Sequence, residues 1–433
     1  MEIIIDTLKP FKDNLNDDAP IINKAIENVS LAGGGKVIIS KGKYKASTII
    51  FKDNVELHLE KDSKITLFDD LSKFKTVNRF RDESINRPTW ENCDYDGMPT
   101  KFFIYANGCK NISITGEGVI DGNEEIFYGT ITKWHIEGSY YPRIPLIFFE
   151  NSRNIKLNGI TLTRSAFWTV HLVGDQYVDI ENITIDNNLK LTNCDGIDPD
   201  HSKHVNIKNC NISCADDCVV IKTTKGGVKY GECEDINVSK CTFKSTSAAI
   251  KIGTESCSDF KNIHFENIDI ISSNRGISLM LRDEGNINDC SFKNINMDLR
   301  LFSKIHWWGS DEGISITAVP REDKVGKISN LLFENININS ENGLLIYGND
   351  NISNITLKNI DLTINKKTDY PHENIDLRPG KFGIIESKFY ALTVVGANDI
   401  TFDSFNVKKD CDYIDELYNI SKAKNINFKN TTI

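Results

Sequence analysis

The chain has 433 residues, of which 39% are hydrophobic and 26% are charged, a balance that is typical of folded globular proteins and excludes an intrinsically disordered one. The formal net charge is −10, which argues against general nucleic-acid binding because that function needs a basic surface. The same charge repels polyanions at long range, so recognition of an anionic ligand has to be local.

The N-terminal residues contain neither the basic region nor the apolar run of a signal peptide, and no apolar segment is long enough to span a bilayer. The 11 cysteines are scattered and odd in number. Cys210, Cys214 and Cys218 share one spacing but form no CxxC pair, so we expect packed, reduced thiols and no bound metal or cofactor. These features predict a cytoplasmic protein that does not bind membranes.

The first predicted element is an amphipathic helix near the N-terminus. Asp17 and Asp18 precede Ala19-Pro20, and proline is favoured in the first turn of a helix. Apolar residues follow at helical spacing, and the glycines at 33–35 end the helix. We interpret residues 1–35 as a cap for the repeats that follow, since an open end of a repeat stack exposes apolar surface.

From residue 36 onward a motif recurs in which Asn or Asp precedes an alternating apolar strand, at intervals of about 23 to 31 residues or about double that. Copies begin at Asn111, Asn154, Val205, Asp235, Asn262, Asn330, Asn354, Asp399 and Asn425, and in the third copy Asn206 is the second residue. Alternation with β-branched residues predicts strands, and Asn tolerates left-handed turns and stacks in ladders. The pattern predicts an all-β fold, a single-stranded right-handed parallel β-helix, with one domain over 1–433 and coils over 36–433.

Three segments interrupt the repeat, near 71–100, 127–145 and 301–321. Insertions in a solenoid form loops on one face and often wall a binding cleft. The third segment contains Trp307 and Trp308, which point to opposite faces if they lie in a strand. We expect one of these tryptophans to line the cleft.

Carboxylates are concentrated between Asn193 and Lys222. The motif N-C-D-G-I-D occupies 193–198, and D-D-C follows at 216–218, about one repeat later. If each repeat is one turn of a solenoid, the two clusters lie on neighbouring turns and face one another. Facing carboxylates are what glycosidic bond cleavage needs, one as acid and one as base. In the alternative interpretation the same acids lie in solvated turns or bind a cation such as calcium.

Over nearly its whole length the chain resembles the polygalacturonase-type glycosyl hydrolases of family 28. N-C-D-G-I-D is similar to the family's N-T-D-G-x-D, and A-D-D-C at 215–218 to its G/Q-D-D-C. The resemblance implies inverting hydrolysis of an oligosaccharide, with Asp216 as general acid and Asp195 and Asp217 activating the attacking water. Adjacent carboxylates cannot all ionise cheaply, so one of them should keep a proton near neutral pH.

Further site residues are expected around these acids. Asn193 and Asp198 would orient the carboxylates through hydrogen bonds. The segment S-A-F-W-T-V-H at 165–171 is similar to one that many bacterial family members carry. Within it, Trp168 would form a platform for a sugar ring and His171 a hydrogen-bonding edge.

Two motifs of typical polygalacturonases are missing. The G-H-G motif aligns with 247–254, where Ala248 takes the position of the histidine. The R-I-K motif aligns with 276–282, where Ser278 and Met280 replace the basic residues that grip a galacturonate carboxylate. The sequence therefore identifies the reaction better than the sugar.

Basic residues nearby offer a replacement. In one hypothesis Lys251, Arg282 and Glu255 form a new substrate subsite, with Lys222 following the Asp pair in the same strand. In the alternative, Lys251 is an exposed solenoid lysine and Arg282 pairs with its neighbours Asp283 or Glu284.

The favoured function is exo-acting hydrolysis of pectic oligosaccharides, since a cytoplasmic enzyme does not meet intact polymer. Three alternatives stay open: a hydrolase for a different or neutral sugar, a lyase or epimerase of the same fold, and a non-catalytic carbohydrate-binding β-helix. The pattern of Asp195, Asp216 and Asp217 favours hydrolysis. The sequence does not indicate an oligomeric state.

Overall fold

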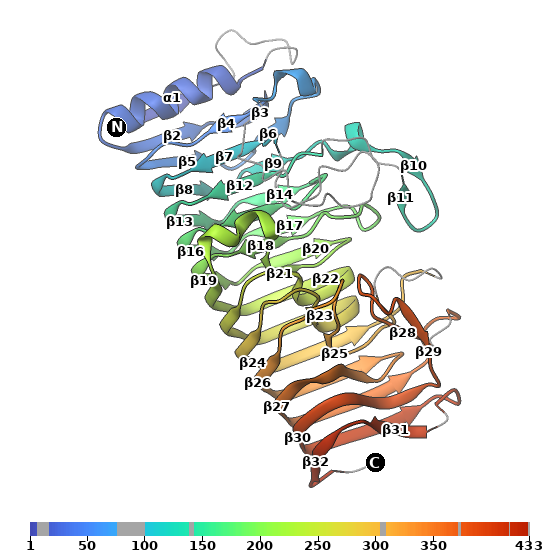
Figure 1. The fold of residues 1–433 in the computed structure, drawn as a ribbon. Helices are drawn as coiled ribbons and strands as arrows, with labels where there is room; N and C mark the ends of the chain where they lie inside the picture. The colour runs from blue at the N-terminus through green and yellow to red at the C-terminus, as the bar shows by residue number, and fades with distance from the viewer. Residues whose placement is uncertain are drawn as a thin grey trace. The chain divides into compact units, whose positions relative to one another are not determined.

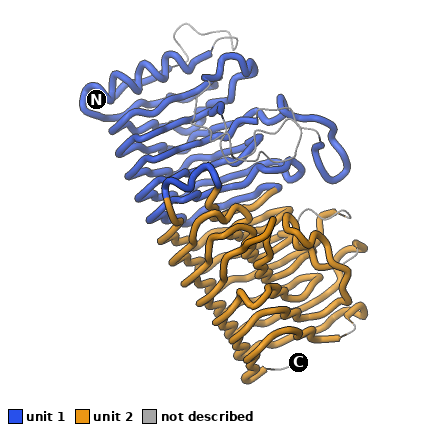
Figure 2. Tube along the Cα trace, in the orientation of Figure 1, with its two compact units in different colours: residues 1–215, 225–230 blue, residues 216–224, 231–433 orange. Residues whose placement is uncertain are grey.

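The computed structural model describes residues 1–6, 17–75, 100–137, 143–303, 309–370, 374–414 and 416–431 (Figure 1). The chain divides into two compact units, coloured separately in Figure 2. Unit 1 consists of residues 1–215 and 225–230, and unit 2 of residues 216–224 and 231–433. A single domain over 1–433 therefore stays a prediction.

The predicted cap helix is confirmed as α1 (Ala19–Leu31), which follows the strand β1 (Glu2–Ile5). Asp18 is the N-cap residue, but its side chain makes no capping bond. Instead, Asp17 Oδ1 accepts the Ala19 N–H at 2.9 Å. Asp17 Oδ2 also accepts the Ser47 hydroxyl at 2.5 Å, and Asp18 Oδ2 accepts the Lys45 N–H at 2.9 Å. The two acids thus fasten the start of the helix to the first coils.

Unit 1 is built of short strands that stack in parallel and in register. Ile147, for example, pairs with Ile104 on one side and Val170 on the other, so like residues of successive coils form continuous apolar columns. The parallel strands are β2 (Gly35–Ile39), β3 (Gly42–Ala46), β4 (Ile49–Ile50), β5 (Val55–Leu59), β6 (Ser63–Leu67), β7 (Ile104–Asn107), β8 (Lys110–Gly116), β9 (Val119–Asp121), β12 (Ile147–Glu150), β13 (Arg153–Asn158), β14 (Thr161–Thr163), β15 (Val170–Val173), β16 (Gln176–Glu181), β17 (Thr184–Asp186), β18 (Ile197–Asp200), β19 (Lys203–Lys208) and β20 (Asn211–Cys214).

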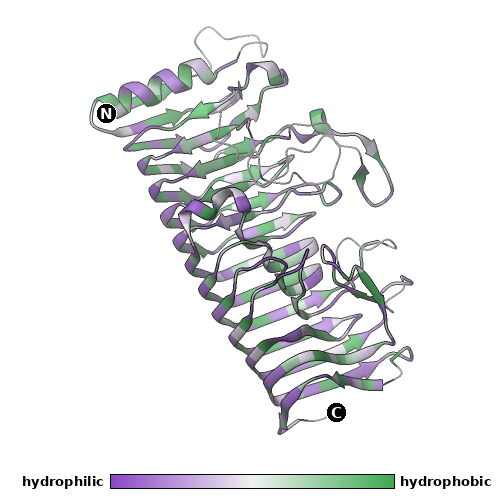
Figure 3. Ribbon diagram, in the orientation of Figure 1, coloured by the Kyte–Doolittle hydropathy of each residue, from purple (hydrophilic) through white to green (hydrophobic). Residues whose placement is uncertain are grey.

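Unit 2 has the same architecture, with longer strands that bend at the corners of the coils. The rings of Phe265, Phe292 and Phe333 stack inside it, with centroids 5.6 and 4.9 Å apart. Its parallel strands are β21 (Val219–Thr223), β22 (Cys233–Ser256), β23 (Phe260–Leu281), β24 (Ile287–Leu299), β25 (Ile314–Ala318), β26 (Ile328–Ser340), β27 (Leu344–Asn365), β30 (Tyr390–Asp410), β31 (Glu416–Ser421) and β32 (Lys424–Lys429). The predicted parallel β-helix is confirmed, and hydrophobic and hydrophilic residues alternate along its strands (Figure 3).

The Asn and Asp residues of the repeat occupy the corners of the coils. The eight copies that begin with Asn or Asp have a positive φ between 54° and 57° at that residue. In the copy at Val205 the prediction is wrong, because His204 and not Asn206 has the positive φ, which is 57°. Their side chains form ladders: Asn154 Nδ2 donates to Asn111 Oδ1 at 2.8 Å, and Asn354 Nδ2 donates to Asn330 Oδ1 at 2.6 Å. The repeat therefore reflects a left-handed backbone that Asn adopts readily.

The predicted insertions are described only in part. Most of the first lies outside the described residues, as do Trp307 and Trp308 in the third. The second contains an antiparallel pair, β10 (Thr130–Ile131) and β11 (Ile136–Glu137). An additional hairpin, β28 (Asn374–Asp376) and β29 (Ile384–Glu386), was not predicted.

The cysteines of the described part of the chain are free thiols, as expected. In the same part of the chain, no helix combines the length and apolarity needed to cross a membrane.

Candidate active site

In unit 1, the segment that contains Asp195 is held against the preceding coil by its backbone. Asp195 O accepts the Thr169 N–H at 2.9 Å, and Gly196 O accepts the Val170 N–H at 3.0 Å. These bonds lead directly into β18, where Asp198 lies opposite His171 of β15. Both Asp195 and Asp198 are buried, with 2% and 0% of their surfaces exposed.

Arg143 holds Asn193 and was not predicted from the sequence. Its Nη2 donates to Asn193 Oδ1 at 2.7 Å, and its Nη1 donates to Ala166 O at 3.2 Å and to Thr192 O. The only signal in the sequence is that Arg143 lies in the second predicted insertion. An arginine that reaches from a loop to a motif two coils later cannot be paired from spacing alone.

Trp168 and His171 do not lie where the sequence analysis placed them. Both side chains are fully buried, and their rings pack edge to face with centroids 4.7 Å apart. His171 Nε2 lies 3.1 Å from Asp200 Oδ2, which is also fully buried. The prediction that Trp168 forms a sugar platform is therefore wrong, because Trp168 belongs to the core of the coil that supports Asp195.

Within unit 1, the cysteine of the first acidic motif accepts a backbone hydrogen bond. The Ala215 N–H donates to Cys194 Sγ at 3.3 Å. Cys194 directly precedes Asp195, and Ala215 directly precedes Asp216 in the chain. The cysteine that replaces the family's threonine thus has a structural role, because its sulfur accepts this backbone hydrogen bond.

In unit 2, Asp217 is surrounded by donors. Its Oδ1 accepts the Ser247 hydroxyl at 2.9 Å and the Ala248 N–H at 3.1 Å, and its Oδ2 lies 2.7 Å from Lys251 Nζ. Asp217 is 1% exposed and Asp216 is 6% exposed. These three donors fix the orientation of the Asp217 carboxylate. Ala248 contributes through its backbone, although it lacks the family's imidazole.

Lys222 and Glu255 form a second ion pair on the same face, with Nζ and Oε2 3.2 Å apart. Burial alone would raise the pKa of Glu255, but Lys222, Arg321 and Lys251 together lower it to about 2. Lys251 therefore lies between two carboxylates and is neither a free subsite lysine nor an exposed one, since its side chain is 12% exposed. Lys222, Lys251 and Glu255 of the predicted subsite are thus brought together, but in two ion pairs.

Arg282 is separate from this group. Its side chain is fully buried, and its Nη1 donates to Leu281 O at 2.8 Å and to Thr317 Oγ1 at 3.0 Å. The predicted pairing with Asp283 or Glu284 is wrong, because Asp283 binds Arg321 at 3.1 Å and Glu284 binds Lys324 at 3.4 Å.

The hairpin β28–β29 lies over the strands where the basic family motif is missing. The residues Ser278 and Met280 are 0% and 2% exposed, although they alternate with core residues and point outward from the coil. Arg275 extends over Met280, with Nη1 3.6 Å from the sulfur, and its Nη2 donates to Asp376 O at 3.3 Å. The hairpin thus covers this part of the coil surface.

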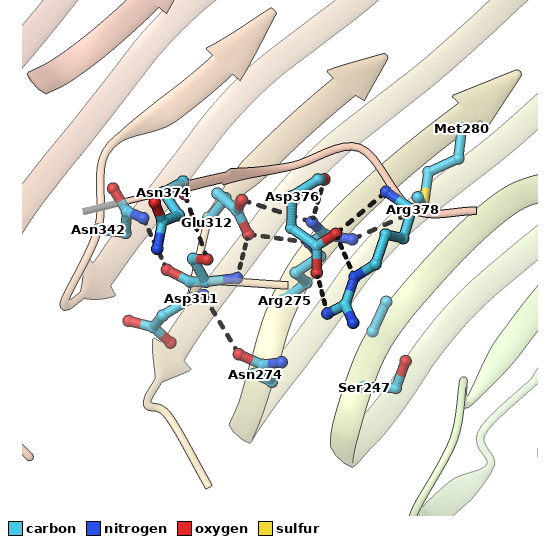
Figure 4. Close-up of polar contacts among 12 residues, drawn as sticks. Ser247, Asn274, Arg275, Met280, Asp311, Glu312, Asn342, Asn374, Asp376 and Arg378 are labelled. Carbon is cyan, nitrogen blue, oxygen red and sulfur yellow. Dashed lines mark hydrogen bonds and ion pairs between the residues drawn. The ribbon is translucent and has the colours of Figure 1, made fainter. Parts of the chain in front are cut away.

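An ion-pair network anchors the hairpin (Figure 4). Arg275 Nε donates to Glu312 Oε2 at 2.8 Å, and Arg378 binds both oxygens of Asp376 at 2.9 and 2.8 Å. Figure 4 shows Arg275 between Glu312 and Asp376, with Arg378 on the far side of Asp376. No sequence pattern indicates this network, because its members lie far apart in the chain: Arg275 and Asp376 are separated by 101 positions.

Comparison with known proteins extends these observations. A probable polygalacturonase of Vitis vinifera is 27% identical over 258 residues, covering 57% of this chain and 50% of the relative. A probable exopolygalacturonase B of Emericella nidulans is 25% identical over 287 residues, covering 61% and 59%. The chain therefore spans less than two thirds of the length of these relatives.

The structure of an exopolygalacturonase from Thermotoga maritima has the same fold, with a TM-score of 0.63 at 20% identity, covering 99% of this chain and 92% of that one. The sequence profile of glycosyl hydrolases family 28 matches residues 53–375, which is more than half of the chain. The chain belongs to glycosyl hydrolases family 28.

Proposed function

We propose that the protein is a glycoside hydrolase that cleaves O-glycosidic bonds with inversion of configuration. The observation that carries the proposal is the Asp217 carboxylate, fixed by Ser247, Ala248 and Lys251 directly after Asp216. Family membership supports it, because the two acidic motifs are those that the family resemblance assigns to catalysis. The family resemblance also assigns Asp195 to catalysis.

In the proposed mechanism Asp216 protonates the leaving oxygen as the bond to the anomeric carbon breaks. Asp195 and Asp217 hold a water molecule on the opposite face and accept its proton as it attacks. The donors around Asp217 keep its oxygens in place, so little reorganisation is needed when the proton arrives. Arg143 would hold Asn193 and so orient the first acidic motif, N-C-D-G-I-D.

The substrate in this proposal is a pectic oligosaccharide that contains galacturonic acid. The relatives support this class, since they are described as a probable polygalacturonase and a probable exopolygalacturonase. Exo action is supported by the hairpin β28–β29, which binds Arg275 where that side chain extends over Met280. A covered coil surface stops a long polymer from lying across it and favours binding of chain ends.

We also propose that the enzyme acts in the cytoplasm. Free thiols in the described part of the chain, most of them buried, support a reducing compartment. Cell fractionation with an antibody to the protein tests this, and recovery of the protein outside the cytoplasm would contradict it.

Substitution of Asp216 by Asn tests the mechanism. We expect a loss of at least about 100-fold in turnover of oligogalacturonides, because general acid catalysis contributes this much or more, while folding and binding are retained. Asp369, whose side chain is 98% exposed, provides a matched control, Asp369→Asn, with unchanged turnover. NMR of the first product identifies its anomer. Retained configuration, full activity of Asp216→Asn, or an unsaturated product that disappears with a chelator contradicts inverting hydrolysis.

A further inference from the structure

Arg282 has an unused hydrogen-bonding edge in the interior of unit 2. Its side chain is fully buried, yet Nε and Nη2 have no hydrogen-bond partner among the residues that the structure describes. Only Nη1 is bonded, to the carbonyl of Leu281 and to Thr317. A buried guanidinium with unmatched donors is unfavourable, because the lost contacts with water are not replaced.

The carboxylates near Arg282 are bound by other arginines and do not supply the acceptors that its guanidinium lacks. Asp376 is bound by Arg378 through both oxygens, and Asp283 is bound by Arg321. Glu312 is bound by Arg275, whose charge also acts on Arg282. In the described part of the chain, each of these three carboxylates is thus bound by a guanidinium other than that of Arg282. Burial, then Arg275 and Arg321, lower the pKa of Arg282 to about 9.

The free edge has the geometry of a carboxylate receptor. Nε and Nη2 lie on the same side of a guanidinium, and their two parallel N–H bonds match the two oxygens of a carboxylate. A bidentate carboxylate would supply both missing acceptors and the missing negative charge.

A single turn of backbone closes this edge from solvent. Gly380, in the tip 377–383 of the hairpin, lies so close that a Cβ on it would be 3.2 Å from Arg282 Nε. The tip is attached by the Lys381 N–H, which donates to Pro320 O at 2.9 Å. Phe382 in the tip is 52% exposed, whereas Leu377 at the start of the tip is fully buried, so few apolar contacts oppose opening of the part of the tip that follows Leu377.

We propose that Arg282 binds the carboxylate of an acidic sugar when the tip 377–383 opens. The inference rests on the proposed function, since the acidic sugar is the uronic acid of the same oligosaccharide. It assigns recognition of the acid to a residue four positions after the site of the missing family arginine, under a hairpin from a later coil.

Binding of D-galacturonic acid and of D-galactose to the full-length protein tests the proposal by calorimetry, without any need for turnover. We expect the parent to bind the acid at least about 10-fold more tightly, as charge-assisted bidentate bonds do. Arg282→Gln should lose this preference, and Arg282→Lys should keep part of it, because lysine retains the charge but not the fork. Lys324→Gln removes an exposed cation near the same end of the coil and should change the affinity for neither sugar.

Thermal unfolding without ligand separates recognition from a structural role. Replacement of an uncompensated buried charge is expected to leave the melting temperature of Arg282→Gln unchanged or higher. A lower melting temperature together with an unchanged preference for the acid overturns the proposal, as does a parent protein that binds neither sugar or both equally. If Arg282→Gln does not fold, Arg282→Lys decides by the same comparison.

Different results would contradict the proposed hydrolase function and the proposed carboxylate site at Arg282. Arg282-dependent binding of galacturonic acid by a parent that hydrolyses no galacturonide contradicts the proposed function and supports the anion site. Hydrolysis of galacturonides with the same acid preference in Arg282→Gln supports the function and contradicts the anion site.

Discussion

At the scale of single residues, the acids of the candidate site are buried and individually supported. Lys251 Nζ lies 2.7 Å from Asp217 Oδ2, and Lys222 lies 3.2 Å from Glu255. Charge-assisted bonds of this kind are shorter and stronger than neutral ones. Lys251 therefore helps to position Asp217, while Lys222 pairs with Glu255.

Replacement of Lys251 by Met tests this support for Asp217. We expect kcat to fall by about 10-fold to 100-fold and the free energy of unfolding by about 1–3 kcal/mol, because Asp217 keeps its burial but loses its charged donor. Steady-state kinetics and urea unfolding measure the two effects. Lys261→Met, at an exposed position on β23, is the matched control. Equal behaviour of the two variants would show that Lys251 does not support Asp217.

The lowered pKa of Glu255 predicts how the stability of the protein depends on pH. Its pKa is lowered from 4.5 to about 2 in the folded protein, so its contribution is present above the unfolded pKa and is lost as the pH falls toward 2. The contribution is about 3 kcal/mol by linkage. Urea unfolding at pH 6 and pH 2.5 should therefore show a smaller loss of stability for Glu255→Gln than for the parent. A parallel loss in both proteins contradicts the assignment.

At the scale of elements, the ladders of Asn and Asp define where each coil turns. Asn330 has a φ of 57°, donates to Asn288 Oδ1 at 2.8 Å and accepts from Asn354 at 2.6 Å. It thus combines backbone conformation with a side-chain ladder, and a pair of substitutions separates the two.

Asn330→Ala loses both contributions, whereas Asn330→Gly keeps the freedom to adopt a positive φ. We expect Asn330→Ala to lower the free energy of unfolding by about 2 kcal/mol and Asn330→Gly by about 1 kcal/mol. Chemical denaturation of both variants gives the difference. If alanine is tolerated as well as glycine, the left-handed corner is not what selects asparagine.

Hairpin β28–β29 shows what pattern reading misses at this scale. Its strands are three residues long and lie outside the repeat, so no periodicity marks them. Its docking depends on Arg275, Glu312 and Asp376, which the chain brings together only after several coils have formed. The sequence analysis found the missing basic motif but not the element that covers its place.

At the scale of the whole molecule, the cap helix covers the first coil. α1 buries one face, which includes Ile22, Ile26 and Val29, while Ile21 on the other face is 37% exposed. Strand β1 pairs in parallel with β2 next to it. An uncovered first coil would expose apolar surface and unpaired strand edges.

Ile26→Asp should therefore destabilise the cap, because an unpaired charge would be buried against the first coil at a cost of several kcal/mol. The expected result is a lower melting temperature and concentration-dependent aggregation in light scattering. Ile21→Asp introduces the same charge on the exposed face and should remain close to the parent. Aggregation of both variants would point to net charge instead of the cap.

The sequence by itself determined the coils, the cap helix, the corner residues and the two acidic motifs, because each of these depends on contacts between residues at fixed spacing. The tertiary structure decided the rest. Trp168 is buried, Arg143 holds Asn193, Lys251 binds Asp217, and Arg282 keeps a free edge beneath Gly380. These side chains meet partners from loops and distant coils, and the alternation along a strand shows only that a residue points outward, not what covers it.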